Sequence, residues 1–184
     1  MMKKALKIAG IIILVLAVAG YSIREYMISQ TKKASPEQIV NYTKGDTELE
    51  VFYNRPSKKG RVIFGELVPY DVTWRTGANE ATTFTTNADL TIMGKTLPKG
   101  KYTLWTVPNA SSWQVIFNDE MYLWGTGSNG ASRNSDSDAL TVTVPVKTTS
   151  ETELFTITLE EVGEQVHLKL TWDTTTVAVP ITIN

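Results

Sequence analysis

The C-terminal part of the chain alternates apolar and polar residues too regularly to form anything other than β-strands. Every second residue is apolar in the runs 140–146, 155–159, 166–172 and 177–183. A two-residue period puts alternate side chains on opposite faces of a strand, so each run has one face to bury. One-sided burial is typical of antiparallel sheets, because strands of parallel sheets are apolar on both faces.

Earlier runs have the same character and are separated by glycine and proline turn signals. They lie at 47–55, 61–67, 81–86, 90–93, 101–107 and 113–118. Beyond the N-terminal segment no stretch has a helical period, so no helices are available to cover a parallel sheet. The sequence predicts an all-β fold: an antiparallel β-sandwich of about ten strands, immunoglobulin-like or jelly-roll-like.

Residues 1–23 have the composition of a membrane-directed segment. Lys3, Lys4 and Lys7 precede the uncharged run Ile8–Ile23. That run is slightly shorter than the roughly 20 residues that a bilayer core needs, and a snorkelling Lys7 lengthens it. Ala17-Val18-Ala19 also fits a signal-peptidase site, which makes a cleaved signal peptide the alternative. Because the apolar run continues to Ile23, we favour an uncleaved signal anchor.

This interpretation divides the chain into a single transmembrane helix (1–23), a juxtamembrane stalk (24–34) and an exported domain (35–184). The basic N-terminus stays on the cytoplasmic side, so the expected location is a bacterial inner membrane, with the domain on the periplasmic or extracytoplasmic side. Without the three lysines, the 18 basic residues fall to 15 against 19 acidic ones. A negative domain is unsuited to neutralising phosphates, so we expect no nucleic-acid partner.

Several kinds of catalytic or metal site are excluded by composition. Cysteine is absent and His167 is the single histidine. Disulfides, thiolate sites, multi-histidine zinc sites and a histidine-based triad are therefore not available. Asp136 and Asp138 are oxygen ligands that calcium accepts, but their loop lacks the spacing of a calcium motif. We expect neither a cofactor nor a metal.

The segment 68–82, VPYDVTWRTGANEAT, is more polar and aromatic than a plain strand requires. A strand places Trp74 on one face and Arg75 on the other, and Gly77 permits a turn with positive φ there or at Asn79. Arg75, Asn79 and Glu80, beside Tyr70 and Trp74, then form a candidate ligand site in which arginine holds a carboxylate or phosphate. The alternative is a structural corner, with Trp74 in the core and an Arg75–Glu80 ion pair across the turn.

Two further groups have both a functional and a structural interpretation. Basic residues surround the turn at Lys59-Gly60; Arg55 and Arg61 would be the ligands of an anionic glycan or phosphate, or the group is a solvated hairpin tip. The five tryptophans suggest stacking on sugar rings, but the alternation around Trp113 and Trp172 favours the core. The segment 125–138 consists mainly of turn-forming residues and is expected to be a mobile surface loop.

The domain resembles the bacterial domain-of-unknown-function family 2911 (DUF2911). The resemblance follows Tyr53-Asn54-Arg55-Pro56, Trp74-Arg75-Thr76-Gly77-Ala78-Asn79-Glu80-Ala81-Thr82, Trp124-Gly125 and Val179-Pro180-Ile181. It implies an exported β-sandwich and no established activity. Asp71 departs from the pattern, since the family usually has glycine after Pro-Tyr. The segment after Trp124-Gly125 departs too, because relatives tend to have a tyrosine there.

Together these features predict a membrane-anchored, non-catalytic β-sandwich in the cell envelope. Its partner would be a small ligand, a glycan or a protein. The alternative is a hydrolase-like enzyme with Glu80 and Asp71 as acid and base and with Arg75 stabilising charge. A third hypothesis is an interaction module that adds a partner strand to a sheet edge. The residues identify no catalytic group.

Overall fold

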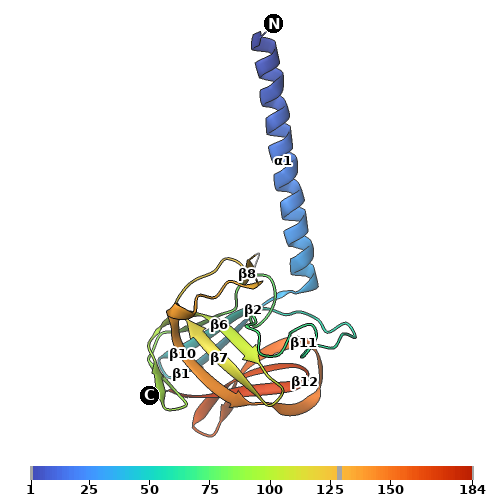
Figure 1. Cartoon of the computed structure of the whole chain (residues 1–184). Coiled ribbons are helices and arrows are strands. Elements are labelled where there is room, and N and C mark those ends of the chain that lie inside the picture. The colour runs from blue at the N-terminus through green and yellow to red at the C-terminus, as the bar shows by residue number, and fades with distance from the viewer. Residues whose placement is uncertain (1, 128–129, 184) are drawn as a thin grey trace. The chain divides into compact units, whose positions relative to one another are not determined.

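The computed structural model describes residues 2–127 and 130–183, and the chain divides into two compact units, Met1–Ala34 and Ser35–Asn184. The first unit contains the helix α1, Met2–Ala34 (Figure 1). In the described part of the chain, its segment Lys7–Ala34 is the one helix long and apolar enough to cross a membrane, as an anchor or as a signal sequence. The same helix includes residues 24–34, the expected juxtamembrane stalk.

The second unit consists of two antiparallel sheets and a small two-stranded one. Within the described residues the strand order is β1-β2-β3-β6-β7-β10 in the larger sheet, β11-β12-β4-β5 in the second and β8-β9 in the small sheet. The strands are β1 Glu37–Lys44, β2 Thr47–Asn54, β3 Thr83–Thr86, β4 Leu90–Ile92, β5 Lys95–Leu97, β6 Gly100–Pro108, β7 Ser112–Asn118, β8 Thr126–Gly127, β9 Gly130–Ala131, β10 Asp138–Pro145, β11 Lys147–Val162 and β12 Gln165–Ile183.

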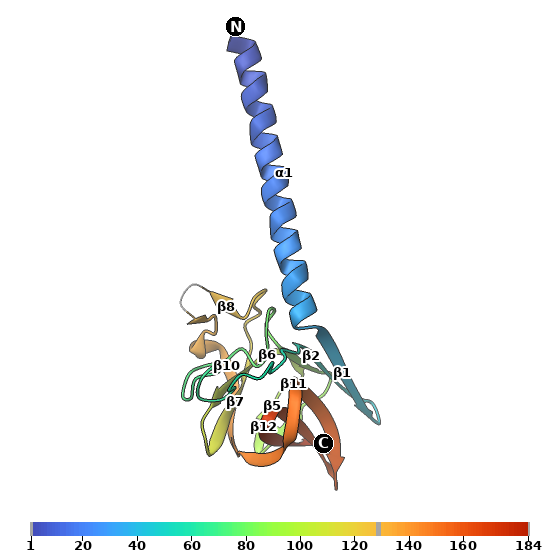
Figure 2. The same cartoon turned by 90° about the vertical axis from the view of Figure 1, so that its right-hand side faces the viewer.

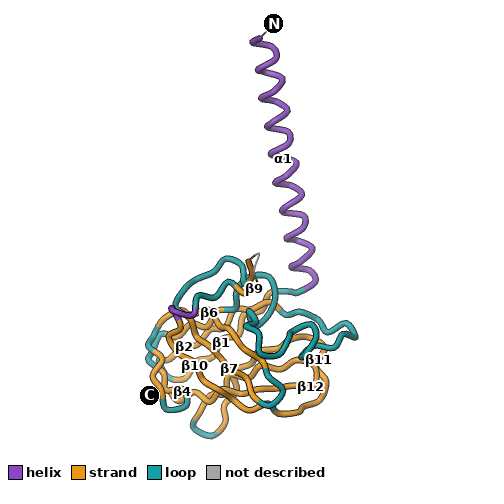
Figure 3. The backbone as a smooth tube through the Cα atoms, in the orientation of Figure 1, coloured by secondary structure: helices purple, strands orange, loops and turns teal. Residues whose placement is uncertain are grey.

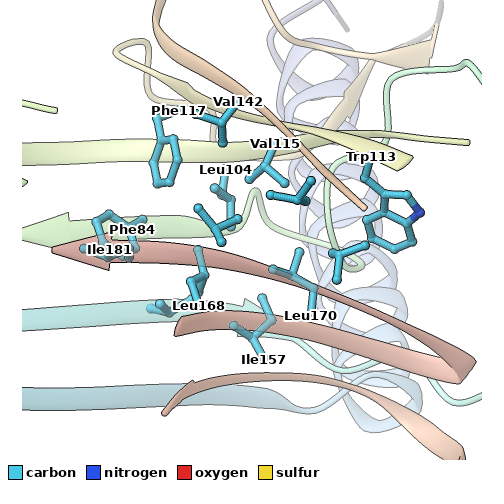
Figure 4. Packing of buried hydrophobic residues seen from close by; sticks show 14 of the residues in the cluster. Phe84, Leu104, Trp113, Val115, Phe117, Val142, Ile157, Leu168, Leu170 and Ile181 are labelled. Carbon is cyan, nitrogen blue, oxygen red and sulfur yellow. The ribbon is translucent and has the colours of Figure 1, made fainter. Parts of the chain in front are cut away.

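The hydrophobic core lies between the two large sheets, as Figure 4 shows for residues from both. Leu104, Phe117 and Val142 come from the larger sheet, and Leu168 and Ile181 come from the second. Val142, Leu168 and Ile181 lie on the faces that the two-residue alternation assigned to the interior. The all-β antiparallel sandwich with an N-terminal helix is therefore confirmed.

The two edge strands of the larger sheet, β1 and β10, both labelled in Figure 2, take part in hydrogen bonds with the second sheet and its turn. On the β1 side, Tyr42 Oη donates to Glu161 Oε1 at 2.6 Å and Lys44 Nζ donates to the Glu164 carbonyl at 3.4 Å. On the β10 side, Lys95 Nζ donates to the Thr141 carbonyl at 3.0 Å. These contacts cover part of each edge, where an unpaired strand would otherwise invite another chain.

A second buried region lies on the outer face of the larger sheet. Trp105 and Ile116 point away from the main core, yet both are buried. The connection between β7 and β10, described for residues 119–127 and 130–137 and called the covering segment below, contributes Tyr122, whose ring centroid is 5.4 Å from that of Trp105. The part of it that we expected to be a mobile loop, from residue 125 onward, contains β8, β9 and the short 3₁₀ helix Ser135–Ser137.

Asn118, at the end of β7, holds the covering segment through its fully buried amide. Its Nδ2 donates to the Asn134 carbonyl at 2.7 Å and to Asp138 Oδ1 at 2.8 Å, while its Oδ1 accepts from the Glu120 backbone N–H at 3.0 Å. Arg133 forms an ion pair with the same Asp138 carboxylate. The carboxylate considered for calcium thus has a cationic partner within the chain.

Candidate functional site

The segment 68–82, called the central segment below, follows β6, leaves it, and returns. Backbone hydrogen bonds join Trp74 and Thr106 in both directions, at 2.7 and 3.0 Å. The Leu104 N–H donates to the Thr82 carbonyl at 2.8 Å, so residues 75–81 form an excursion between two points of contact with β6. Figure 3 draws loops and turns, including this excursion, in teal. Thr76, Gly77 and Asn79 have positive φ values of 56°, 149° and 56°, which confirms the expected turn.

Gly77 is required in this turn for space as well as for its φ. A Cβ atom there would lie 3.0 Å from the Asn54 carbonyl oxygen and 3.1 Å from Thr82 Oγ1. The Thr82 hydroxyl donates to the Thr76 carbonyl at 2.7 Å and closes the excursion. The turn is thus built against the end of β2, and this arrangement directs the side chains on either side of it.

Trp74 points into the sandwich. Its indole ring is stacked on that of Trp172 at 5.9 Å with an interplanar angle of 16°, and it contacts Phe64, Trp113 and Phe155 edge-on or tilted. The Thr76 hydroxyl lies on the same side, 3.2 Å from the hydroxyl of Thr106. Trp74 is therefore a partly buried residue that packs against the core through its aromatic neighbours.

Arg75 points the other way, to the covering segment. Its Nη1 donates to Thr126 Oγ1 at 2.7 Å, and its Nε is buried and has no hydrogen-bond partner among the described residues. Gly125 leaves room for this side chain, since a Cβ atom at Gly125 would lie 2.6 Å from Arg75 Cδ and 2.7 Å from Arg75 Cβ. Burial lowers the pKa of the Arg75 guanidinium below its usual value. The result is a partly desolvated cation with donors left over.

The expected Arg75–Glu80 ion pair is absent from the described part of the chain. Glu80 Oε2 instead accepts a hydrogen bond from Asn54 Nδ2 at 3.1 Å. The positive φ values between the two residues explain the difference, because they turn Glu80 to the end of β2 and leave Arg75 beside the covering segment. Asn79 connects the two sides: its Nδ2 donates to the Ser35 carbonyl at 3.4 Å, and its own carbonyl accepts from Gly125 N–H at 3.2 Å.

Comparison with known protein families gives one match: the model of a protein family of unknown function, DUF2911, matches residues 35–181. The chain belongs to this family. No curated protein and no solved structure matches it. Membership therefore adds no activity, and function must be argued from the DUF2911 domain itself.

The basic group of the DUF2911 domain is held within the structure. Arg55 Nε and Nη2 donate to the Phe155 carbonyl and to Thr156 Oγ1, at 3.3 and 3.0 Å. Arg61 Nε and Nη2 donate to the carbonyls of Lys58 and Ser57, at 3.0 and 2.6 Å. Lys58 Nζ forms ion pairs with Asp173 and Glu151, at 2.7 and 2.9 Å. Arg55 thus fixes the residues after β2 against β11, whereas the hydrogen bonds of the exposed Arg61 stay within its own turn.

Glu153, on β11, accepts two hydrogen bonds from the connection between β2 and β3. Its Oε1 accepts from the Ser57 hydroxyl at 2.6 Å and from the Lys59 N–H at 2.8 Å. These two hydrogen bonds, the Ser57 one foremost, lower the pKa of the Glu153 carboxyl. A carboxyl with a lowered folded-state pKa stabilises the fold above its unfolded pKa of about 4.3, and that stability is lost as the pH falls through the folded value.

We therefore expect Glu153→Gln to be less stable than the wild type at pH 7 and the difference to shrink below about pH 4. Urea unfolding of both proteins at several pH values measures this. Glu66→Gln, at an exposed carboxylate in the connection between β2 and β3, is the matched control and should follow the wild type at every pH. A constant gap between Glu153→Gln and the wild type across the acidic range would show that the carboxylate charge is not involved.

Tyr70 and Asp71 lie at the other end of the central segment. Tyr70 is 40% exposed, and its Cε2 lies 3.0 Å from where a Cβ atom at Gly65 would be. Asp71 has a φ of 60°, which explains why glycine suits this position in the family, and its Oδ1 accepts from Asn109 Nδ2 at 2.8 Å. The departure at Asp71 therefore retains the turn and adds a side-chain hydrogen bond.

The seven predicted site residues do not form one cluster. Arg55, Arg61 and Trp74 have structural partners, and Tyr70 lies at an exposed turn. Glu80 accepts from Asn54 at the end of β2, and Asn79 bonds to Ser35 and Gly125. Of the seven, Arg75 is the one with a buried donor atom, Nε, that has no hydrogen-bond partner among the described residues; beside it lie Thr126 and Gly125. Sequence analysis missed Thr126; the Trp124-Gly125 match to the family was the one signal that pointed to its neighbourhood. Among the described residues no group of three His, Cys, Asp or Glu side chains could hold a metal.

Proposed function

We propose that the protein is a membrane-anchored binding module of the bacterial cell envelope. In this proposal α1 anchors the chain in the inner membrane, and the DUF2911 domain, exported to the extracytoplasmic side, holds an anionic group of an envelope component. The observation that carries the proposal is Arg75, a half-buried cation whose hydrogen-bond partner among the described residues is the neutral Thr126 hydroxyl. A buried charge is normally paired, and an unpaired donor beneath the surface requires an explanation.

The chemistry of the guanidinium indicates which ligand suits it. Its planar array of N–H donors matches the oxygen atoms of a carboxylate or phosphate, and charge-assisted hydrogen bonds are the stronger ones. A bound oxyanion would also attract the guanidinium and so offset the desolvation penalty that lowers the Arg75 pKa. Thr126 and Gly125 fix the side chain beforehand, which reduces the entropy lost on binding.

The hydrolase-like alternative receives less support from the geometry. It requires Asp71, Glu80 and Arg75 to act on one substrate, and each has a different partner. Asp71 accepts from Asn109 at the end of β6, Glu80 accepts from Asn54 at the end of β2, and Arg75 donates to the covering segment. General acid–base catalysis needs its groups within hydrogen-bonding reach of the same reacting atoms.

Phosphate is the probe that tests the proposal. We expect sodium phosphate to raise the melting temperature of the full-length protein in detergent micelles above that in sodium chloride of equal ionic strength. Arg75→Met should abolish the difference, because the thioether occupies similar space without charge or donors. Gly125→Ala should reduce the difference too, because the new methyl group displaces the Arg75 side chain.

Arg61→Gln is the matched control, since the Arg61 guanidinium donates to carbonyl groups of its own turn. It removes the same charge from the same domain and should leave the phosphate response unchanged. Equal responses of Arg75→Met and the wild type would overturn the assignment to Arg75. An equal loss in Arg61→Gln would show a nonspecific effect of net charge.

A further inference from the structure

A polar hollow lies across β1, β2 and β3 on the outer face of the larger sheet, with a volume of about 380 Å³. This volume is within the range of small-molecule sites, roughly 300–1,000 Å³. The polar residues that line this hollow are Asn41, Thr43, Glu48, Glu50, Thr85 and Asn87. It shares no residue with the surroundings of Arg75.

The strand register puts these residues on one face. Glu48 pairs with Thr43 and Glu50 pairs with Asn41 across β1 and β2, and Glu50 pairs with Thr85 across β2 and β3. Glu48 and Glu50 are two positions apart on β2, so both carboxylates leave the sheet on the same side with Cα atoms about 7 Å apart. Leu49, between them, is buried in the core.

One residue of the hollow is already fixed. Asn87 Oδ1 accepts from the Glu48 N–H at 2.8 Å, and its Nδ2 donates to the Asp46 carbonyl at 2.9 Å. Thr85 is partly buried, and its hydroxyl oxygen is buried and has no hydrogen-bond partner among the residues that the structure describes. Such a group is usually satisfied in a native protein, by the chain or by something bound to it.

The carboxylates of the hollow also lack a cation from the chain. Within the described residues neither Glu48 nor Glu50 forms an ion pair. Lys44 donates to the Glu164 carbonyl, and Lys101 lies on β6 opposite Thr85 without an ion pair to Glu50. Two like charges side by side on a sheet face repel each other, and a positive ligand would relieve that repulsion.

We propose that the polar hollow binds a small hydroxylated primary amine. The ammonium group lies between Glu48 and Glu50 and donates to both carboxylates. The ligand's hydroxyl groups bond to the amide of Asn41 and the hydroxyl of Thr43, and they supply the missing partner of Thr85 after a rotation about its χ1 angle. Cation and hydroxyl groups on one small molecule match this lining, whereas an uncharged sugar leaves the two carboxylates unneutralised.

Glucosamine is the probe, followed by NMR on the ¹⁵N-labelled full-length protein in detergent micelles. We expect shifts of the Asn41 and Asn87 side-chain amides on addition of glucosamine hydrochloride, and none on addition of glucose or N-acetylglucosamine at the same ionic strength. The double variant Glu48→Gln/Glu50→Gln should bind glucosamine at least about tenfold more weakly, because it loses two charge-assisted hydrogen bonds. Glu66→Gln, outside the hollow, should bind like the wild type.

The double variant keeps the shape of both side chains and removes the repulsion between them, so it should melt no lower than the wild type. Its melting curve shows whether weaker binding results from unfolding. Absence of shifts with glucosamine, equal shifts with N-acetylglucosamine, or undiminished affinity in a folded double variant would each overturn the proposal. Phosphate binding through Arg75 is unaffected by any of these outcomes, so the two proposals fail separately.

Discussion

Replacing Trp74 with alanine is expected to lower the free energy of unfolding by about 3 kcal/mol, the lower end of the usual cost of removing a tryptophan from a core, because Trp74 is partly buried and packs against the core. The Trp74 ring lies at the centre of an aromatic cluster, stacked on Trp172 at 5.9 Å and contacting Phe155 at 5.0 Å. Its loss would leave a cavity at the point where the central segment meets both sheets. Urea unfolding of the full-length protein in micelles, followed by circular dichroism, measures the change.

Tyr70→Ala is the matched control for this prediction. Tyr70 is an aromatic residue of the same segment, but it is 40% exposed, so we expect a change of about 1 kcal/mol or less. A loss below about 1 kcal/mol in Trp74→Ala would contradict the packing described here. Binding of phosphate per folded molecule should survive the substitution, since Trp74 and Arg75 point to opposite sides of the segment.

The fold could be predicted because its signal is local. Alternation in a short run depends on neighbouring residues alone, and it located the interior positions of β10, β11 and β12. The order of the strands is not written in that pattern. β4 pairs with the C-terminal end of β12, for example Ile92 with Ile181, and no period in either run specifies the partner.

The candidate site could be predicted less well because its contacts are distant in sequence. Arg75 donates to Thr126, 51 residues away, whereas sequence analysis paired it with Glu80, five positions along. Local pairing assumes that a turn brings its two ends together. Here the left-handed φ values of Thr76, Gly77 and Asn79 separate them. The covering segment illustrates the same limit. Its turn-forming residues indicate a loop, but they do not show that the Asn118 side chain hydrogen-bonds to Asn134 and Asp138 and so attaches the loop to the end of β7.

Asn118→Asp should therefore have the second large effect, a loss of about 3 kcal/mol at pH 7, typical of breaking a buried hydrogen-bond network. The new oxygen replaces Nδ2, which donates to Asp138 Oδ1 at 2.8 Å, and so brings two carboxylates together. The pKa of the introduced carboxyl is then raised in the folded state. Its protonated form restores the donor, so the deficit relative to the wild type should be smallest below about pH 4 and grow as the pH rises.

Asn134→Asp makes the same change of charge at an exposed position of the covering segment. It replaces the donor that bonds to Glu120 Oε2 at 3.3 Å, but water screens these exposed carboxylates and aspartate also caps the 3₁₀ helix at Ser135–Ser137, so the loss should be about 1 kcal/mol or less. A pH-independent deficit in Asn118→Asp would mean that the amide acts through its shape alone. Functionally, release of the covering segment removes Thr126 and Gly125 from Arg75. At pH 7 Asn118→Asp should consequently weaken the phosphate response although every atom of Arg75 is intact, which places control of the anion site in the loop that covers the sheet.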